Sequence, residues 1–213
     1  MQLILDNWQF LLQGAYYTLM ITIISMFFGL ILGLLIAILR VKGNIVGRNI
    51  ARFYVSIIRG TPPLVQIFIV YYGLSDFGLQ LEPIPAACIA LSINIAAYVA
   101  EAFRGALQSV PKGQMEAALA SGMTEGQAMK RIVIPQALRY AIPPIGNTFV
   151  GMLKETSLVS AIAVTELMRA AQLLVAQYYT YLPFYLAIAV MYWVMSMFFT
   201  FILGKIEKKL SVY

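Results

Sequence analysis

The sequence predicts an all-helical integral membrane protein with five transmembrane helices, and three observations support this fold class. Hydrophobic residues make up 61% of the 213 residues and charged residues only 11%, with a mean hydropathy of +0.82. A soluble domain needs charged residues at roughly 25% of its positions. Uncharged stretches of about 20 residues, long enough to cross a bilayer, recur along the chain, and Lys and Arg gather in alternate loops between them. No linker long enough to attach a soluble domain interrupts this pattern, so residues 1–213 are predicted to form a single transmembrane domain.

The first two spans differ in regularity. The first, at about 15–39, carries no charge and contains Gly29 and Gly33, whose small size lets another helix approach closely. The second, at about 53–74, is interrupted by the run Arg59-Gly-Thr-Pro-Pro63. Proline cannot continue the hydrogen bonding of a helix. Irregular backbone at membrane depth is tolerated only where it is buried in protein or lines a watery cavity, so this break is a candidate element of a pathway through the membrane.

The third span, at about 84–103, brings three polar side chains into the membrane, those of Asn94, Tyr98 and Glu101. Arg104 lies three residues beyond Glu101, a spacing that lets the two meet on one helical face. We interpret Glu101 and Arg104 as a structural charge pair near the cytoplasmic surface.

The fourth span, at about 141–163, starts with the pair Pro143-Pro144 and contains Lys154 and Glu155. Ionisable groups within a membrane are expensive and are functional hypotheses by default. Because adjacent helical residues point about 100° apart, Lys154 and Glu155 cannot share one face. One of them is therefore expected to pair with another helix while the other meets the solute.

The fifth span, at about 184–204, is uncharged and follows an outer loop that contains Glu166 and Arg169. The loops after the first and third spans, together with the C-terminus, hold nearly all the basic residues. The positive-inside rule then puts the N-terminus outside and the C-terminus in the cytoplasm. The formal charge of +6 is thus explained by orientation in the membrane rather than by binding to nucleic acid.

The polar segment at about 112–136, between the third and fourth spans, reads as two short helices. Residues Gln114 to Ser121 favour a helix, and Gly122 supplies the left-handed residue that commonly follows one. Thr124 with Gln127 forms a capping box that starts a second helix, which Pro135 is expected to end. Two such helices at an angle form a compact knob that can press into a cleft on a partner. The alternative is an ordinary amphipathic surface hairpin.

The spacing within this segment resembles the EAA loop of importer-type ABC permeases, which reads Glu-Ala-Ala, three residues, Gly, nine residues, then Ile-x-Leu-Pro. Only Ile134 departs from it, in place of Leu. The resemblance implies that the matching residues couple the membrane helices to an ATPase, and these residues are Glu116, Ala117, Ala118, Gly122, Ile132 and Pro135.

The resemblance extends from about Trp8 to the last span. It is carried by Arg59-Gly-Thr-Pro62 with Leu64-Val-Gln66 (Pro63 replaces the usual Leu), by the run from Asn94 to Arg104, by Gly146-Asn147, and by Leu153-Lys-Glu-Thr-Ser157. On these motifs the chain is identified as a member of the histidine/glutamine/arginine/cystine permease family, and it is most similar to the cystine and glutamine branches.

That resemblance implies a MetI-like fold and a set of partners in a bacterial inner membrane. Two permease subunits, identical or related, associate with two ATPase subunits, and an extracytoplasmic binding protein delivers the amino acid. The ATP and Mg²⁺ belong to the ATPase. This chain is expected to carry no cofactor, because it has no G-x-x-x-x-G-K-[ST] sequence to cradle phosphates.

We expect the substrate path to be lined by Glu155, Thr61, Asn94 and Tyr98, with Glu155 facing the ammonium group of an amino acid. The broken second span would offer free backbone groups to the carboxylate, as half-helices do in other transporters. The alternative is that the intramembrane charges only hold the fold together.

Two other classes of protein compete with this interpretation. An ion-gradient-driven secondary transporter would explain the broken span but not the cytoplasmic knob. An intramembrane metalloenzyme is disfavoured because the chain has no histidine and only one cysteine, Cys88, so it offers few metal ligands. No metal site and no catalytic residue are therefore expected.

Overall fold

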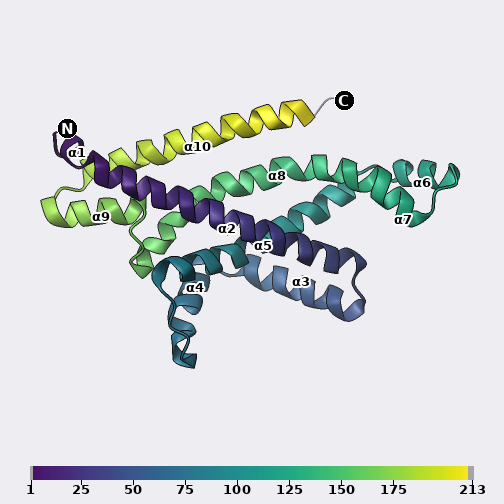
Figure 1. Ribbon diagram of the computed structural model, residues 1–213, viewed down its shortest axis with the longest axis horizontal. Helices are drawn as coiled ribbons and strands as arrows, with labels where there is room; N and C mark the ends of the chain where they lie inside the picture. The colour runs from purple at the N-terminus through teal and green to yellow at the C-terminus, as the bar shows by residue number, and fades with distance from the viewer. Residues whose placement is uncertain (1, 211–213) are drawn as a thin grey trace.

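The computed structural model describes residues 2–210, and all the regular elements within that range are helical, as predicted (Figure 1). Elements η1 and η3 are π-helical, and η2 and η4 are 3₁₀-helical. The elements are, in order, α1 (Gln2–Asp6), α2 (Trp8–Lys42), α3 (Ile45–Gly60), α4 (Pro63–Phe68), η1 (Ile69–Gly73), η2 (Ser75–Phe77), α5 (Pro83–Ser109), α6 (Lys112–Ala120), α7 (Glu125–Ala128), η3 (Met129–Val133), α8 (Ile134–Glu155), η4 (Thr156–Ile162), α9 (Leu167–Tyr178) and α10 (Leu182–Leu210).

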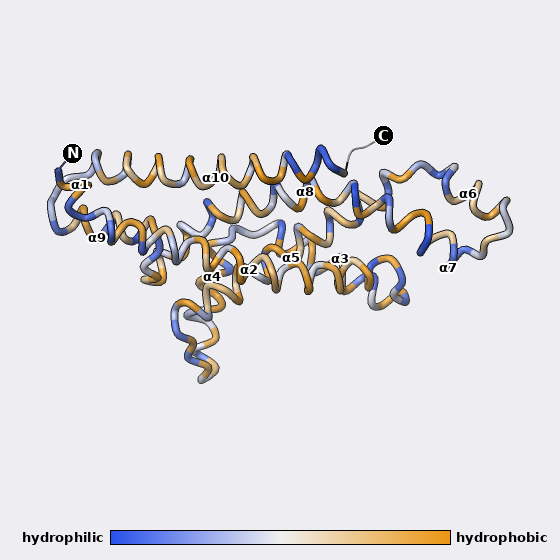
Figure 2. Tube along the Cα trace, turned by 45° about the horizontal axis from the view of Figure 1, so that its top comes forward, coloured by the Kyte–Doolittle hydropathy of each residue, from blue (hydrophilic) through white to orange (hydrophobic). Residues whose placement is uncertain are grey.

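Helices α2, α5, α8 and α10 run along the long axis of the molecule (Figures 1 and 2). Three helices are long and apolar enough to cross a membrane, namely α2, α5 and α10. Two further spans result if each of two bent helix pairs is one crossing. The predicted spans at about 15–39, 84–103 and 184–204 lie within α2, α5 and α10.

The predicted break in the second span is confirmed. Helix α3 ends at Gly60, α4 begins at Pro63, and the helical segment Pro63–Phe77 is bent by 108° from α3. Because Pro62 and Pro63 lack backbone N–H groups, the α3 hydrogen bonds cannot continue through them. Beyond the break, α4 packs against α5, with Gln66 and Ile67 buried, and the chain then leads away from the bundle through η1 and η2; we call residues 63–79 the projecting arm (Figure 1).

The fourth span differs from its prediction at its start. We expected Pro143-Pro144 to begin the helix, but both prolines lie inside α8, which starts at Ile134. Each proline leaves one carbonyl in the preceding turn without its usual donor. Such defects are tolerated in membrane helices because neighbouring groups satisfy the backbone again.

Helices α2 and α5 pack closely because two glycines face α5. A Cβ on Gly29 would lie 2.4 Å from Ile95 Cγ2, and one on Gly33 would lie 2.6 Å from Val99 Cβ and 2.8 Å from the Ala96 carbonyl oxygen. The main apolar core forms along this contact, with Ile95 and Val99 essentially buried. The helix that approaches the Gly29 and Gly33 pair of α2 is therefore α5.

We expect Gly33→Val to destabilise the chain by about 2 kcal/mol, because a backbone carbonyl cannot move away from the new side chain. Gly105→Val is the matched control, since no atom lies within 4 Å of a Cβ built at Gly105. The measurement is the thermal unfolding midpoint of the purified chain in detergent. Equal midpoints for the two variants would contradict the close-packing argument.

The outer segment before the last span is not the loop that we expected. Residues 167–178 form helix α9, and Glu166 is its fully buried N-cap, accepting hydrogen bonds from the N–H groups of Met168 and Arg169 at 2.9 and 2.8 Å. The same carboxylate also accepts from Tyr192 at 2.8 Å and from Thr18 at 3.4 Å. It therefore joins α2, α9 and α10.

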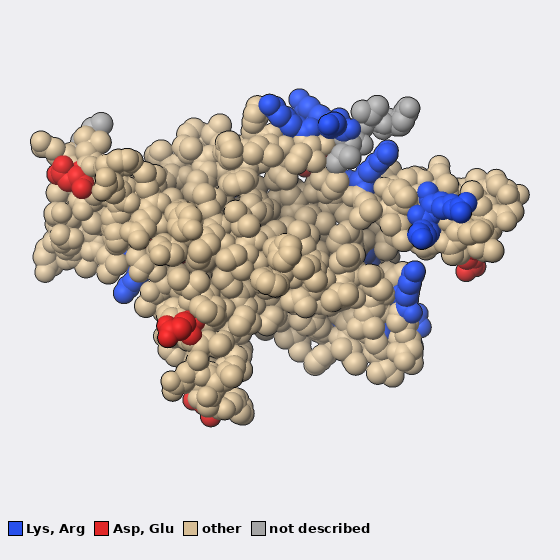
Figure 3. Space-filling view, viewed as in Figure 1, with Lys and Arg blue, Asp and Glu red and all other residues tan. Residues whose placement is uncertain are grey.

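Charge is distributed unevenly between the two ends of the molecule. Most of the visible Lys and Arg side chains gather at the end formed by α6, α7, the start of α3 and the end of α10 (Figure 3). Most of the visible Asp and Glu lie away from that end, and the middle of the bundle is predominantly apolar (Figure 2).

Candidate translocation site and coupling element

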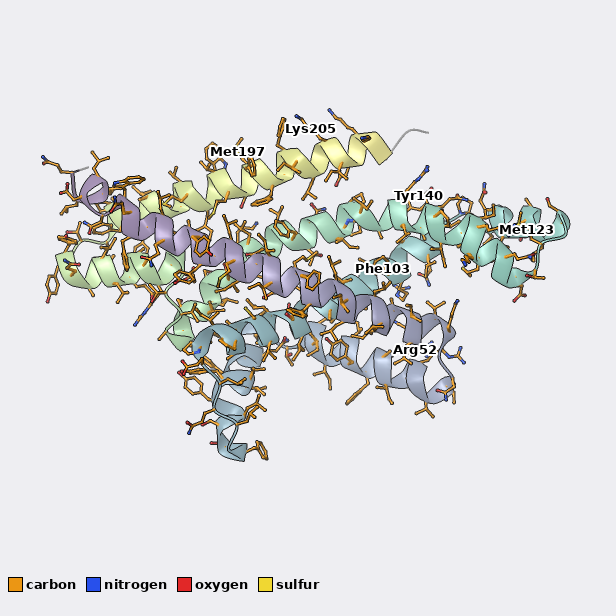
Figure 4. All side chains as sticks on the ribbon, in the orientation of Figure 1. Arg52, Phe103, Met123, Tyr140, Met197 and Lys205 are labelled. Carbon is orange, nitrogen blue, oxygen red and sulfur yellow. The ribbon has the colours of Figure 1, made fainter. Side chains whose placement is uncertain are left out.

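The segment between α5 and α8 folds as two short helices joined at Gly122, as predicted. Gly122 has φ of +85°, and nearly all residues other than glycine avoid this left-handed region. Its N–H bonds to the Leu119 carbonyl at 2.9 Å, and the N–H of Met123 bonds to the Ala118 carbonyl at 3.1 Å. This pair of bonds is the Schellman motif, which satisfies the last carbonyls of α6. We call residues 112–133 the knob, and Met123 lies near its tip (Figure 4).

The predicted capping box is also present. Gln127 N–H donates to Thr124 Oγ1 at 3.3 Å, and Thr124 N–H donates to Gln127 Oε1 at 3.0 Å. The two motifs fix where α6 ends and α7 begins, so the bend between them is set by local sequence. Glu116 and Ala117 lie exposed on α6, whereas Ala118 is buried.

The prediction that Pro135 ends the second knob helix is wrong. The backbone stays helical through the π-helical turn Met129–Val133 and continues as α8, with Pro135 in its first turn. Ile134 N–H bonds to the Met129 carbonyl five residues back, and Pro135 occupies a position where a missing N–H is tolerated. The knob and the fourth span are therefore one continuous helical path.

Packing also holds the knob against the end of α5 and the start of α8. Val133 and Ala137 are buried against Val110 at the end of α5, with Met115 and Met129 packed around them. Gln136 Nε2 donates to Gln114 Oε1 at 3.1 Å, which ties the start of α8 to α6. Movement of the knob must therefore carry α8 with it.

Helices α5 and α8 line a cavity of about 400 Å³ midway along the bundle. Its polar lining residues are Asn94 and Tyr98 from α5, and Asn147, Thr148 and Glu155 from α8. Thr148 and Glu155 are seven residues apart, or about two helical turns, which puts them on one face of α8, and Asn147 lies beside Thr148. Amide, hydroxyl and carboxylate groups in a space of this size suit a small polar solute.

Three of the four residues expected along the substrate path meet in this cavity, namely Asn94, Tyr98 and Glu155. Thr61 does not line it. Its hydroxyl donates to the Ile57 carbonyl at 2.9 Å and accepts from Gln66 at 2.9 Å, within the break between α3 and α4. Lys154 is not among the described residues that line the cavity. This agrees with the expectation that Lys154 and Glu155 lie on different faces of the helix.

Gln66 connects the break to the cavity, and sequence reasoning missed it as a site residue. Its Nε2 lies within hydrogen-bonding distance of the Ile58 and Thr61 carbonyls, at 2.8 and 3.1 Å. Its Oε1 accepts from Asn94 Nδ2 at 2.9 Å. Gln66 and Asn94 are both buried, so the amide of Gln66 holds α3, α4 and α5 at one point. The sequence signals for this role were the position of Gln66 three residues after Pro63 and its place in the Leu64-Val-Gln66 motif.

We expect Gln66→Leu to reduce transport about tenfold and to lower thermal stability. The change leaves the buried Asn94 amide and two carbonyls without partners, at a cost of about 1–3 kcal/mol for each unsatisfied group. The control is Gln80→Leu, the same chemical change at an exposed position. Uptake into proteoliposomes and the unfolding midpoint are the measurements, and a Gln66→Leu protein as active as the control would refute the assignment.

The predicted pair of Glu101 and Arg104 is part of a larger cluster. Arg104 Nε donates to Glu101 Oε1 at 2.9 Å, and Arg40 Nη1 of α2 donates to Glu101 Oε2 at 2.5 Å. Arg59 Nη1 of α3 lies 3.9 Å from the same carboxylate, and the Arg59 guanidinium lies 5.4 Å from the centre of the Tyr98 ring. One carboxylate therefore joins α2, α3 and α5 beside the cavity.

Comparison with known proteins agrees with this geometry. The profile of the binding-protein-dependent transport system inner membrane component family matches residues 29–212. The chain is 42% identical over 207 residues to the L-cystine transport system permease protein TcyB of Bacillus subtilis (strain 168), covering 97% of this chain and 88% of that protein. It is 35% identical over 204 residues to the glutamine transport system permease protein GlnP of Escherichia coli (strain K12), covering 95% of this chain and 93% of that one.

Solved structures give the same result. The crystal structure of an amino acid ABC transporter with histidines matches with a TM-score of 0.94 at 37% identity, over 97% of this chain and 96% of that chain. An inward-facing MetNI methionine ABC transporter matches with a TM-score of 0.80 at 21% identity, over 97% of this chain and 98% of that chain, a likeness of fold alone. The predicted MetI-like fold is confirmed.

Proposed function

The chain belongs to the binding-protein-dependent transport system inner membrane component family of ABC permeases, and from this premise we propose that it imports a polar amino acid of the cystine and glutamine class. One observation carries the proposal: a single helix, α8, both lines the polar cavity and continues directly from the knob. A displacement of the knob would therefore also displace α8, which forms one wall of the cavity.

The cavity chemistry supports a zwitterionic substrate. Glu155 supplies a carboxylate for an ammonium group, and Asn94 and Asn147 supply amide donors for a carboxylate group. The broken backbone after α3, linked to Asn94 through Gln66, is the candidate source of further donors. An amino acid of modest size then occupies the space between α5 and α8.

An ATPase subunit is the proposed partner of the knob. The residues that match the EAA spacing lie on α6, at the Gly122 bend, in η3 and at the start of α8. Glu116 and Ala117 are exposed on α6. ATP and Mg²⁺ would bind that partner, because this sequence contains no phosphate-binding P-loop.

A second permease subunit, identical or related, is the proposed partner of the projecting arm. Phe77 is 87% exposed, and Ile69 and Tyr72 also face outward on this arm. Tyr98 and Glu155 are exposed at the cavity, so this chain leaves one side open. A second subunit would cover both the apolar side chains of the projecting arm and the open side of the cavity.

The proposed topology is a single transmembrane domain of five spans, with the N-terminus outside and the C-terminus in the cytoplasm of a bacterial inner membrane. The gathering of Lys and Arg at the knob end supports this orientation under the positive-inside rule (Figure 3). An extracytoplasmic binding protein would then deliver the amino acid at the opposite end.

The test is to co-express the chain with an ATPase subunit and a binding protein of the same transport family and to reconstitute the complex in proteoliposomes. ATP hydrolysis and uptake are measured across amino acids, beginning with cystine, glutamine and arginine. Stimulation by one of these is the expected result. Uptake that follows a proton gradient and ignores ATP would overturn the proposal in favour of a secondary transporter.

A further inference from the structure

A second cavity, of about 400 Å³, lies at the knob end of the bundle, apart from the substrate cavity. Three arginines line it, Arg40 from α2, Arg52 from α3 and Arg104 from α5, and Gln108 adds an amide. Met129 and Val133 of η3 form part of its apolar wall. We call it the arginine pocket, and Arg52 can be located on α3 in Figure 4.

The pocket has an excess of positive charge. Three guanidinium groups line it, and Glu101 forms ion pairs with two of them, those of Arg40 and Arg104, which gives 3 − 1 = +2 for these residues. Arg59 competes for the same carboxylate at 3.9 Å. Within residues 2–210, Arg52 makes no hydrogen bond or ion pair, and Arg40 engages Glu101 through Nη1 alone. Most of the N–H donors of these two arginines are therefore free to meet an anion.

The depth of the pocket suits a lipid headgroup. Arg40 lies in the last turn of α2, a helix long and apolar enough to span a membrane. The end of such a span lies at headgroup level, and in the proposed topology, on which this step rests, the basic end faces the cytoplasmic leaflet, which holds anionic lipids. Basic pockets between membrane helices on that side bind phosphate headgroups.

The apolar surface beside the pocket favours a lipid over a free phosphate. On α3, Ile45, Ile50 and Phe53 are 64%, 59% and 68% exposed, and Phe53 directly follows Arg52. A free anion would leave this apolar surface uncovered, whereas acyl chains would cover it. The surroundings therefore suit a ligand with a negative head and an apolar tail.

We propose that the arginine pocket binds the phosphodiester headgroup of an anionic phospholipid in the cytoplasmic leaflet, with its acyl chains along the exposed face of α3. Because η3 forms one wall and α2, α3 and α5 supply the arginines, the headgroup bridges the knob to the rest of the bundle. The lipid then stabilises the coupling path. This site is separate from substrate binding and goes beyond the proposed function.

The test uses the full chain in its complex with the ATPase, in nanodiscs of phosphatidylcholine alone or of phosphatidylcholine with an equal amount of phosphatidylglycerol. Arg52→Gln removes one pocket charge without touching the Glu101 cluster, and Lys42→Gln removes one exposed charge that does not line the pocket. Native mass spectrometry counts the phosphatidylglycerol retained by the permease chain. We expect Arg52→Gln to weaken retention about fivefold and Lys42→Gln to leave it unchanged.

A second measurement reports the coupling between substrate and ATP hydrolysis. Phosphatidylglycerol should raise substrate-stimulated ATP hydrolysis in the unmodified complex and with Lys42→Gln, but not with Arg52→Gln. Equal lipid retention by the two variants would overturn the proposal. It would also be overturned if inorganic phosphate, added to phosphatidylcholine nanodiscs, raised ATP hydrolysis as much as phosphatidylglycerol does. Loss of the ATPase subunit from Arg52→Gln in pure phosphatidylcholine would also overturn it, because the pocket would then meet an acidic protein surface. Retention is measured on the chain itself, so its failure leaves the proposed transport function intact.

Discussion

Replacement of Gly122 by valine is expected to reduce substrate-stimulated ATP hydrolysis by the reconstituted complex tenfold or more. Gly122 has φ of +85°, where a β-branched side chain is strained by about 1–3 kcal/mol. The strain is relieved only if the Schellman bonds at Leu119 and Ala118 break. The bend between α6 and α7 then changes, and the knob no longer fits its partner.

The matched control is Gly122→Asn, because asparagine visits the left-handed region more readily than other residues with a side chain. No atom lies within 4 Å of a Cβ at this position, so added volume alone should do no harm. Asparagine should retain most of the activity that valine abolishes. Equal activity of the two variants would show that the backbone of this bend does not matter for coupling.

Elements that depend on local sequence could be predicted. The break at Pro62-Pro63 follows from missing N–H groups, and the knob follows from a glycine stop and a capping box, which each involve residues within six positions of one another. The spans follow from apolar length alone. These features require no knowledge of which helices are neighbours.

Partners from distant parts of the chain could not be predicted. Gln66 and Asn94 are 28 residues apart, Arg40 and Glu101 are 61 apart, and Thr18 and Glu166 are 148 apart. Sequence spacing brings Arg104 to Glu101, but nothing local indicates that helices α2 and α3 contribute two more arginines to the same carboxylate. The partners of Glu166, Thr18 on α2 and Tyr192 on α10, were missed for the same reason.

Pro135 illustrates a different kind of failure. The rule that proline ends a helix assumes regular α-helical hydrogen bonding. A π-helical turn at Met129–Val133 changes the register just before it, so that Pro135 falls in a first turn, where no N–H is needed. The consequence is functional, because the helix that the rule would have ended instead connects the knob to the cavity.

Replacement of Glu155 by glutamine is expected to weaken uptake about 10- to 100-fold while the complex with the ATPase still assembles. Glu155 is the acidic residue among the described groups that line the cavity. A hydrogen bond to a charged partner contributes about 1.5–3 kcal/mol, so loss of the carboxylate should raise the substrate concentration needed for half-maximal uptake. Glutamine keeps the size of the side chain, which limits the change to charge.

The adjacent Lys154→Gln variant makes the comparison specific. It removes one charge one residue away, on a face of α8 that does not line the cavity, so its uptake should stay close to that of the unmodified chain. If both variants lose uptake equally, the charges at the end of α8 hold the fold rather than the substrate. If only Glu155→Gln is impaired, the carboxylate acts within the cavity, and the helix that the knob moves is also the helix that holds the amino acid.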